Sequence, residues 1–149
     1  MILLKLLEQS FLGFISSAGF SILLLVPIKL APYAGVSGMV GWVVYFVSTK
    51  LGLGVYFSNL LAAFFIEAIS MYYARHKKCP ATLFNIPGIV PLVPGAATYY
   101  MTYHLVMGSY LKGMYFMIRA GGIAVAIAAG LILYDACHRF YFRLRAKKL

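Results

Sequence analysis

Asn85-Ile-Pro-Gly-Ile-Val-Pro-Leu-Val-Pro-Gly95 is as apolar as a membrane span, yet it carries three of the chain's six prolines. Pro91 and Pro94 have no N–H, so a helix through this stretch would leave the carbonyls near Pro87 and Val90 without helical partners. In lipid, such groups must be satisfied by protein, water or a ligand. The stretch therefore predicts either a proline-kinked structural helix or a discontinuous transporter helix, whose interrupted backbone forms a binding site.

The composition is that of an integral membrane protein. Of the 149 residues, 63% are hydrophobic and 11% are charged, whereas soluble domains contain roughly 25% charged residues. Eight of the thirteen lysines and arginines behind the net charge of +10 lie in two short segments, residues 75–78 and 139–148. Both segments flank apolar spans, and basic residues gather on the cytoplasmic side of membrane proteins. The charge therefore indicates no nucleic-acid partner.

Five apolar segments predict an all-α integral membrane protein with four or five transmembrane helices, the fourth of which is broken by the Pro/Gly motif. The single transmembrane domain covers residues 1–149, with spans at about 6–26, 33–49, 55–73, 82–107 and 114–134, and a basic cytoplasmic tail at 135–149. The count is four if the fourth segment is re-entrant and five if it crosses. With both basic segments inside, the C-terminus is cytoplasmic.

Three ionisable side chains fall within the predicted spans. Glu67 is a candidate for ion or proton coupling, because a carboxylate at membrane depth is costly and is often functional; a structural hydrogen bond is the alternative. His104, beyond the break, is a second candidate for proton coupling or a packing residue. Arg119 either contacts an anionic substrate or extends to the outer interface. Asp135 and Arg139 are spaced for a local ion pair at a helix end.

The sequence does not favour an enzyme. It contains no nucleophile elbow, P-loop, HExxH or dinucleotide fingerprint, and its three acidic residues leave few general acid–base candidates. We therefore expect no catalytic residue and no cofactor. Four residues are of metal-binding types but match no standard zinc spacing, so no metal site is expected either: His76, Cys79, Cys137 and His138.

Three features occur in an order found in one transporter family: Gly19-Phe20 followed by Pro27, the basic turn 76–78, and Ile89-Val-Pro-Leu-Val-Pro-Gly95 running into Tyr99. In these features the chain resembles the C-terminal, five-span half of the threonine/serine exporter family. In many bacteria that half is a separate small subunit, and the small subunit of a succinate exporter is one such member. The resemblance extends over nearly the whole chain.

The resemblance implies a multi-pass protein of the bacterial cytoplasmic (inner) membrane. It implies secondary export of small amino acids (threonine or serine) or dicarboxylates (succinate), driven by an ion gradient. It also implies a larger partner subunit that carries the family's other half. Two alternatives stay open. One is a structural scaffold for that partner, which would use the small-residue stripes of spans one, two and five, and the other is a homo-oligomeric channel.

At the break itself we expect the substrate site, because a new helix N-terminus can receive a carboxylate and unwound backbone can bind ligands. The predicted substrate-binding residues are Pro91, Pro94, Gly95, Ala96, Thr98 and Tyr99.

Overall fold

The computed structural model describes residues 2–146, and within them the chain is helical, which confirms the all-α prediction. The elements are α1 (Ile2–Leu23), α2 (Ala31–Lys50), α3 (Val55–Lys77), α4 (Thr82–Ile89), the 3-10 turn η1 (Val90–Leu92), α5 (Gly95–Val106) and α6 (Tyr110–Ala146). Three helical stretches in the described chain are long and apolar enough to cross a membrane: Leu4–Leu23, Val55–Lys77 and Tyr110–Phe140. A count of four or five crossings stays a prediction.

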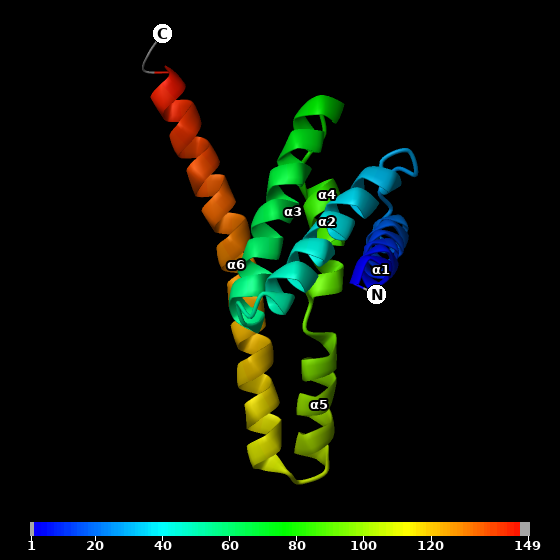
Figure 1. Cartoon of the computed structure of the whole chain (residues 1–149), viewed down its shortest axis with the longest axis vertical. Helices are drawn as coiled ribbons and strands as arrows, with labels where there is room; N and C mark the ends of the chain where they lie inside the picture. The colour runs from blue at the N-terminus through cyan, green and yellow to red at the C-terminus, as the bar shows by residue number, and fades with distance from the viewer. Residues whose placement is uncertain (1, 147–149) are drawn as a thin grey trace.

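Helix α6 is the longest element and runs the length of the molecule (Figure 1). Its 37 residues span about 55 Å at 1.5 Å per residue, so the predicted fifth span continues into the predicted tail as one helix up to Ala146. The start of α6 packs against α5, and α6 packs against α3 from about Gly122 onward. The α5–α6 hairpin extends beyond the bundle that α1, α2, α3 and α4 form (Figure 1).

Basic residues gather at one end of the bundle. Three segments lie toward the top of Figure 1. They are the α1–α2 connection with Lys29, the C-terminal end of α3 with the basic residues of 75–78, and the C-terminal end of α6. The α2–α3 connection lies at the opposite end of the bundle. Helix α3 ends because Lys78 adopts a left-handed conformation (φ 52°) and Pro80 follows.

Helix α2 is central because its glycines let other helices approach closely. A Cβ atom on Gly38 would lie 1.7 Å from the Ser17 hydroxyl oxygen of α1, and one on Gly41 would lie 2.3 Å from Ile66 Cδ1 of α3. In the apolar environment of a membrane, such small-residue contacts replace the hydrophobic effect as the main source of helix association.

The glycines of α6 make the corresponding contacts with α3. A Cβ atom on Gly122 would lie 2.7 Å from Tyr56 Cε1, and one on Gly130 would lie 2.3 Å from the Leu60 carbonyl oxygen. The small-residue stripes of the second and fifth predicted spans thus pack within the chain, and these faces are not free for a partner.

We expect the substitution Gly130→Ala to lower the free energy of unfolding by about 1–3 kcal/mol, the usual cost of overpacking. The added methyl group meets a backbone carbonyl, which cannot rotate away as a side chain can. Thermal unfolding of the detergent-solubilised protein measures the effect.

Gly121→Ala is the matched control, because it lies on the same helix and a Cβ atom there meets nothing within 4 Å. We expect it to be neutral or stabilising by up to about 1 kcal/mol, the helix-propensity gain of alanine over glycine. Equal unfolding temperatures for the two variants would contradict the tight α3–α6 contact.

Candidate functional site

The helical path is interrupted between α4 and α5. After the 3-10 turn, Val93 adopts an extended conformation (φ −58°, ψ 132°) and Pro94 has ψ 54°, and α5 begins at Gly95. The expectation that the carbonyls near Pro87 and Val90 lack partners is wrong. The Val90 N–H donates to the Pro87 carbonyl, and the Val93 N–H donates to the Val90 carbonyl at 3.2 Å, because the tighter turn moves each donor one residue earlier.

Two N–H groups at the break, at the start of α5, are free donors. The Gly95 N–H donates to the Val93 carbonyl at 2.8 Å and the Thr98 N–H donates to the Pro94 carbonyl at 3.0 Å. The N–H groups of Ala96 and Ala97 have no backbone acceptor within the described chain. They lie at a helix N-terminus, which carries a partial positive charge. The break thus offers two adjacent donors to an anion.

The residues that carry these donors, Ala96 and Ala97, line a cavity of about 280 Å³, which we call the break pocket. Its size is close to the lower limit of ligand sites, roughly 300 Å³. Four segments of the chain line it: Pro91–Ala97 and Tyr100 around the break, Trp42 and Tyr45 of α2, Val55 and Asn59 of α3, and Phe116, Arg119 and Ile123 of α6. An apolar and aromatic wall with a few convergent polar groups is typical of a small-molecule site.

The structure gathers most, but not all, of the residues predicted to bind substrate. Four of them line the break pocket: Pro91, Pro94, Gly95 and Ala96. Thr98 and Tyr99 do not line it. The Thr98 hydroxyl donates to the Pro94 carbonyl at 3.0 Å, and Tyr99 is 65% exposed. Because α5 turns by about 100° per residue, only part of its first turn can face the pocket.

Arg119 of α6 is exposed; it lines the break pocket and also a second cavity, between α6 and the start of α3. Its guanidinium group makes no ion pair or hydrogen bond with any residue that the structure describes. A guanidinium group has five N–H donors in a planar arrangement that matches a carboxylate. Arg119 and the Ala96–Ala97 N–H groups therefore provide positive charge and free donors in one cavity.

Several residues that line the break pocket were not predicted from the sequence to belong to a site. Asn59 is buried, its side-chain amide donates to the Val55 carbonyl at 2.8 Å, and its carbonyl oxygen accepts no hydrogen bond from the described residues. Trp42 and Tyr45 pack ring against ring, with centroids 5.3 Å apart. Asn59 is a polar residue in an apolar span and Trp42 is the only tryptophan, but neither signal relates them to a break about forty residues away in the sequence.

An apolar cluster closes the break pocket toward the basic end of the bundle. Its members are Ala62, Ala63, Ile66, Leu92, Ile123 and Ile127. Ile66 is fully buried between two glycines: Cβ atoms on Gly41 and Gly88 would lie 2.3 Å and 3.0 Å from its side chain. Along α3 the order is the pocket residue Asn59, this cluster, and then Glu67.

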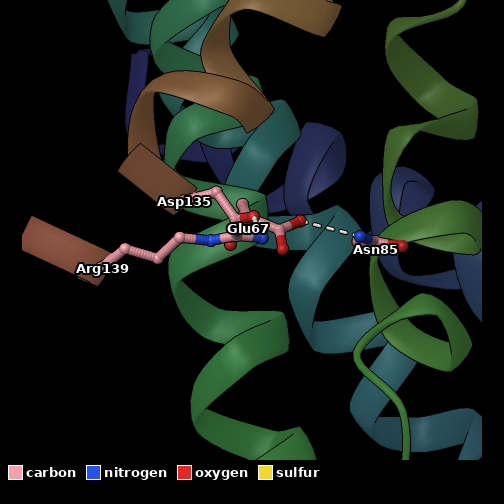
Figure 2. A network of polar contacts seen from close by, with 4 residues as sticks. All are labelled: Glu67, Asn85, Asp135 and Arg139. Carbon is pink, nitrogen blue, oxygen red and sulfur yellow. Dashed lines mark hydrogen bonds and ion pairs between the residues drawn. The ribbon is translucent and has the colours of Figure 1, made fainter. Parts of the chain in front are cut away.

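Glu67 lies beyond this cluster and is only 6% exposed. The side-chain amide of Asn85 in α4 donates to its carboxylate at 2.8 Å (Figure 2). Asp135 and Arg139 of α6 lie on the other side of Glu67 (Figure 2). Arg139 donates to Asp135 at 3.0 Å, which confirms the predicted local ion pair. Glu67 thus contacts α4, the helix that leads into the break.

The remaining candidates lie apart from the pocket. The His104 ring of α5 stacks on Phe116, with centroids 5.6 Å apart, and does not line the pocket. His138 of α6 contacts Arg75 of α3. Among the residues described, no group of three or more histidine, cysteine, aspartate or glutamate side chains is placed to hold a metal ion.

A family model described as "Threonine/Serine exporter, ThrE" matches residues 9–137 of the chain. The match includes every residue that lines the break pocket and also includes Glu67 and Asn85. No solved structure matches the chain.

We expect Asn85→Leu to destabilise the protein by about 1–3 kcal/mol, because it leaves a buried carboxylate without its donor. The double variant Glu67→Leu/Asn85→Leu is expected to regain most of this loss, since it removes both polar partners. Thermal unfolding of the single and double variants measures both effects. If the double variant were as unstable as the sum of the two single variants, the Glu67–Asn85 contact would not be the cause.

Proposed function

This chain belongs to the threonine/serine exporter family, and from that membership and the break pocket we propose that it is the small membrane subunit of a secondary exporter for serine and threonine. One observation carries the proposal. Arg119, Ala96 and Ala97 line the same pocket, and a guanidinium group together with the unpaired N–H groups of Ala96 and Ala97 suits the carboxylate that every amino acid carries.

The rest of the pocket suits the other end of an amino acid. The free carbonyl oxygen of Asn59 can accept a hydrogen bond from an ammonium or hydroxyl group. The aromatic side chains of Trp42, Tyr45 and Tyr100 also line the pocket, and aromatic faces attract cations. Arg119 is the only charged side chain among the lining residues described. This favours a zwitterion over a dicarboxylate such as succinate, whose second carboxylate would have no cation.

We propose that the basic end of the bundle is cytoplasmic, as the distribution of lysine and arginine favours. The protein is then a multi-pass protein of the bacterial inner membrane with a cytoplasmic C-terminus. In this orientation the break pocket lies on the outer side of the apolar cluster that contains Ile66. Export requires this cluster to open toward the cytoplasm while the outer side closes.

We assign ion coupling to Glu67 in preference to His104. The Glu67 carboxylate is buried and bonded to Asn85 of α4, four residues before Ile89, where α4 ends and the break begins. A change in the charge of Glu67 alters this bond and hence the position of α4 relative to α3. His104 lies on the other side of the pocket, on the exposed hairpin, where its ring stacks on Phe116.

We further propose that a larger subunit of the same family completes the transporter. The α5–α6 hairpin supports this, because its large side chains are exposed on several faces: Tyr99, Tyr103, Val106, Leu111, Met114, Tyr115 and Ile118. The two other readings, a scaffold and a homo-oligomeric channel, make different predictions. A scaffold does not need the pocket, and a channel does not show saturable, gradient-driven flux.

We expect Arg119→Gln to raise the KM for serine efflux by about ten- to a hundredfold, the loss of a hydrogen bond to a charged group worth roughly 1.5–3 kcal/mol. Efflux of labelled serine, threonine and succinate from proteoliposomes, with the chain alone and with its larger partner, measures the effect. Lys112→Gln is the control, because Lys112 is a cation near the start of α6 that does not line the pocket.

Gly95→Leu in the same assay separates transport from scaffolding. A Cβ atom at Gly95 meets nothing within 4 Å, so the leucine side chain can enter the pocket without distorting the fold. Assembly with the partner but loss of efflux supports the exporter. Normal efflux in both Arg119→Gln and Gly95→Leu would rule out the break pocket as the substrate site.

Glu67→Gln tests the coupling assignment. We expect exchange of labelled for unlabelled serine to persist, because the pocket is intact, while efflux driven by a proton gradient falls at least tenfold. His104→Gln is expected to leave both activities unchanged. Gradient-driven efflux at the normal rate in Glu67→Gln would exclude Glu67 as the coupling group.

A further inference from the structure

The Glu67 carboxylate has no cationic partner in the part of the chain that the structure describes. It is 6% exposed, and the hydrogen bond that it accepts comes from the neutral side-chain amide of Asn85. Asp135, on the α6 side of Glu67, has Arg139 as its own ion-pair partner (Figure 2). Because an unpaired negative charge at membrane depth is costly, this site favours the binding of a proton or a metal cation.

Two buried side-chain oxygens of α3 and α4 make no hydrogen bond with any described residue. They are the hydroxyl oxygen of Ser70, which is fully buried, and the amide oxygen of Asn85. The hydroxyls of Ser37 and Ser58, in contrast, donate to carbonyls three or four residues earlier in their helices. Buried oxygens without a partner cost free energy, and in native proteins they usually serve a bound water or ion.

The packing of α3 against α4 fixes which residues of the two helices are opposite each other. A Cβ atom on Gly88 would lie 3.0 Å from the Ile66 side chain, and the rings of Tyr73 and Phe84 have centroids 5.9 Å apart. A later residue of α3 thus meets an earlier residue of α4, so the two helices run antiparallel.

Ser70 and Asn85 both lie between these two contacts. Ser70 is four residues after Ile66 and three before Tyr73, so it lies on the face of α3 that contacts α4. Asn85 directly follows Phe84, and its amide donates to Glu67 at 2.8 Å. Since Ser70 is also three residues after Glu67, the carboxylate and the two unpaired oxygens lie together between α3 and α4.

This set of oxygens suits a metal cation better than a proton alone. A proton on Glu67 makes one hydrogen bond, so it satisfies only one of the two unpaired oxygens. A cation can contact the carboxylate, the Ser70 hydroxyl oxygen and the Asn85 amide oxygen together, once the Asn85 amide has turned by half a rotation. The oxygen and nitrogen of an amide are nearly the same size, so this rotation needs no extra room.

The charge of the site selects a monovalent cation. Glu67 supplies one negative charge, and the other two ligands are neutral. A divalent cation would leave a net positive charge within the membrane, which is costly. Carboxylate, hydroxyl and carbonyl oxygens are the ligands of hard cations, and this donor set differs from the histidine and cysteine sets of zinc.

We propose that Glu67, Ser70 and Asn85 form a binding site for Na⁺, and that Na⁺ bound there is a coupling ion of the exporter. The site rests on the contacts described above, whereas its coupling role rests on the proposed function. A proton and Na⁺ neutralise the same carboxylate and exclude each other, so a gradient of either ion can drive efflux. Asn85 belongs to α4, and the rotation of its amide therefore links the bound ion to the helix that leads into the break.

Cation binding is tested by thermal unfolding of the detergent-solubilised protein in NaCl or choline chloride at constant ionic strength. A ligand that binds only the folded state raises the unfolding temperature once its concentration exceeds the Kd. We expect Na⁺ to raise this temperature by a few degrees in a saturable way. Glu67→Gln should abolish the shift, and Ser70→Ala should move its midpoint to an Na⁺ concentration about tenfold higher, as for the loss of one contact to a charged group.

Ser17→Ala is the matched control. Ser17 is also fully buried and its hydroxyl oxygen also lacks a partner among the described residues, but it lies on α1 against Gly38 of α2. Its removal should leave the midpoint of the Na⁺ response unchanged. A merely structural role of the Ser70 hydroxyl would shift the unfolding temperature by the same amount with and without Na⁺, and that result overturns the site.

A transport assay separates the cation site from the exporter. In proteoliposomes with the larger partner, we expect an inward Na⁺ gradient without a pH difference to drive serine efflux, at least tenfold more slowly in Ser70→Ala. The same unfolding temperature in Na⁺, K⁺ and choline overturns the site. Efflux that responds to protons but not to Na⁺ overturns the inference and leaves the exporter standing. Saturable Na⁺ binding without any efflux overturns the exporter and leaves the cation site.

Discussion

The close approach of helices at glycine is the constraint on which the rest of this structure depends. The Ile66 side chain fits between Gly41 and Gly88, so that α3 contacts both α2 and α4 at one point. Larger residues at either glycine would separate these helices and open the centre of the bundle. In a membrane, where burying apolar surface contributes little to association, such close packing is the main force that holds helices together.

This packing divides the interior into layers along α3 and α6. The break pocket with Arg119 comes first, the apolar cluster around Ile66 and Ile127 second, and the pair Glu67–Asn85 third. Substrate binding and ion coupling are therefore assigned to different layers. Helix α4 connects them, because it carries Asn85 and continues into the 3-10 turn before the pocket. A shift of α4 would therefore move Asn85 in the third layer and the 3-10 turn beside the pocket in the first.

The hydrogen bonds at the break show what a local sequence pattern can and cannot predict. The prolines predict an irregular backbone, and in the structure α5 begins at Gly95. They did not indicate which groups stay unpaired, because Val90 and Val93 supply 3-10 hydrogen bonds to the carbonyls that the prolines leave behind. The same local geometry uses the Thr98 N–H, and it leaves the N–H groups of Ala96 and Ala97 without a backbone acceptor in the described chain. The sequence predicts an irregular backbone here, but it does not show which hydrogen bonds that backbone makes.

The sequence by itself determined the all-helical membrane class and the ion pair of Asp135 with Arg139, and its resemblance to known proteins indicated the family. The helical class follows from composition, and the ion pair follows from residues close together in the chain, where spacing on a helix fixes geometry. Only the tertiary structure decided that Arg119 and Asn59 line the same pocket as the start of α5, and that Glu67 meets Asn85. These neighbours come from different helices, and their meeting depends on helix rotation and packing, which no local pattern encodes.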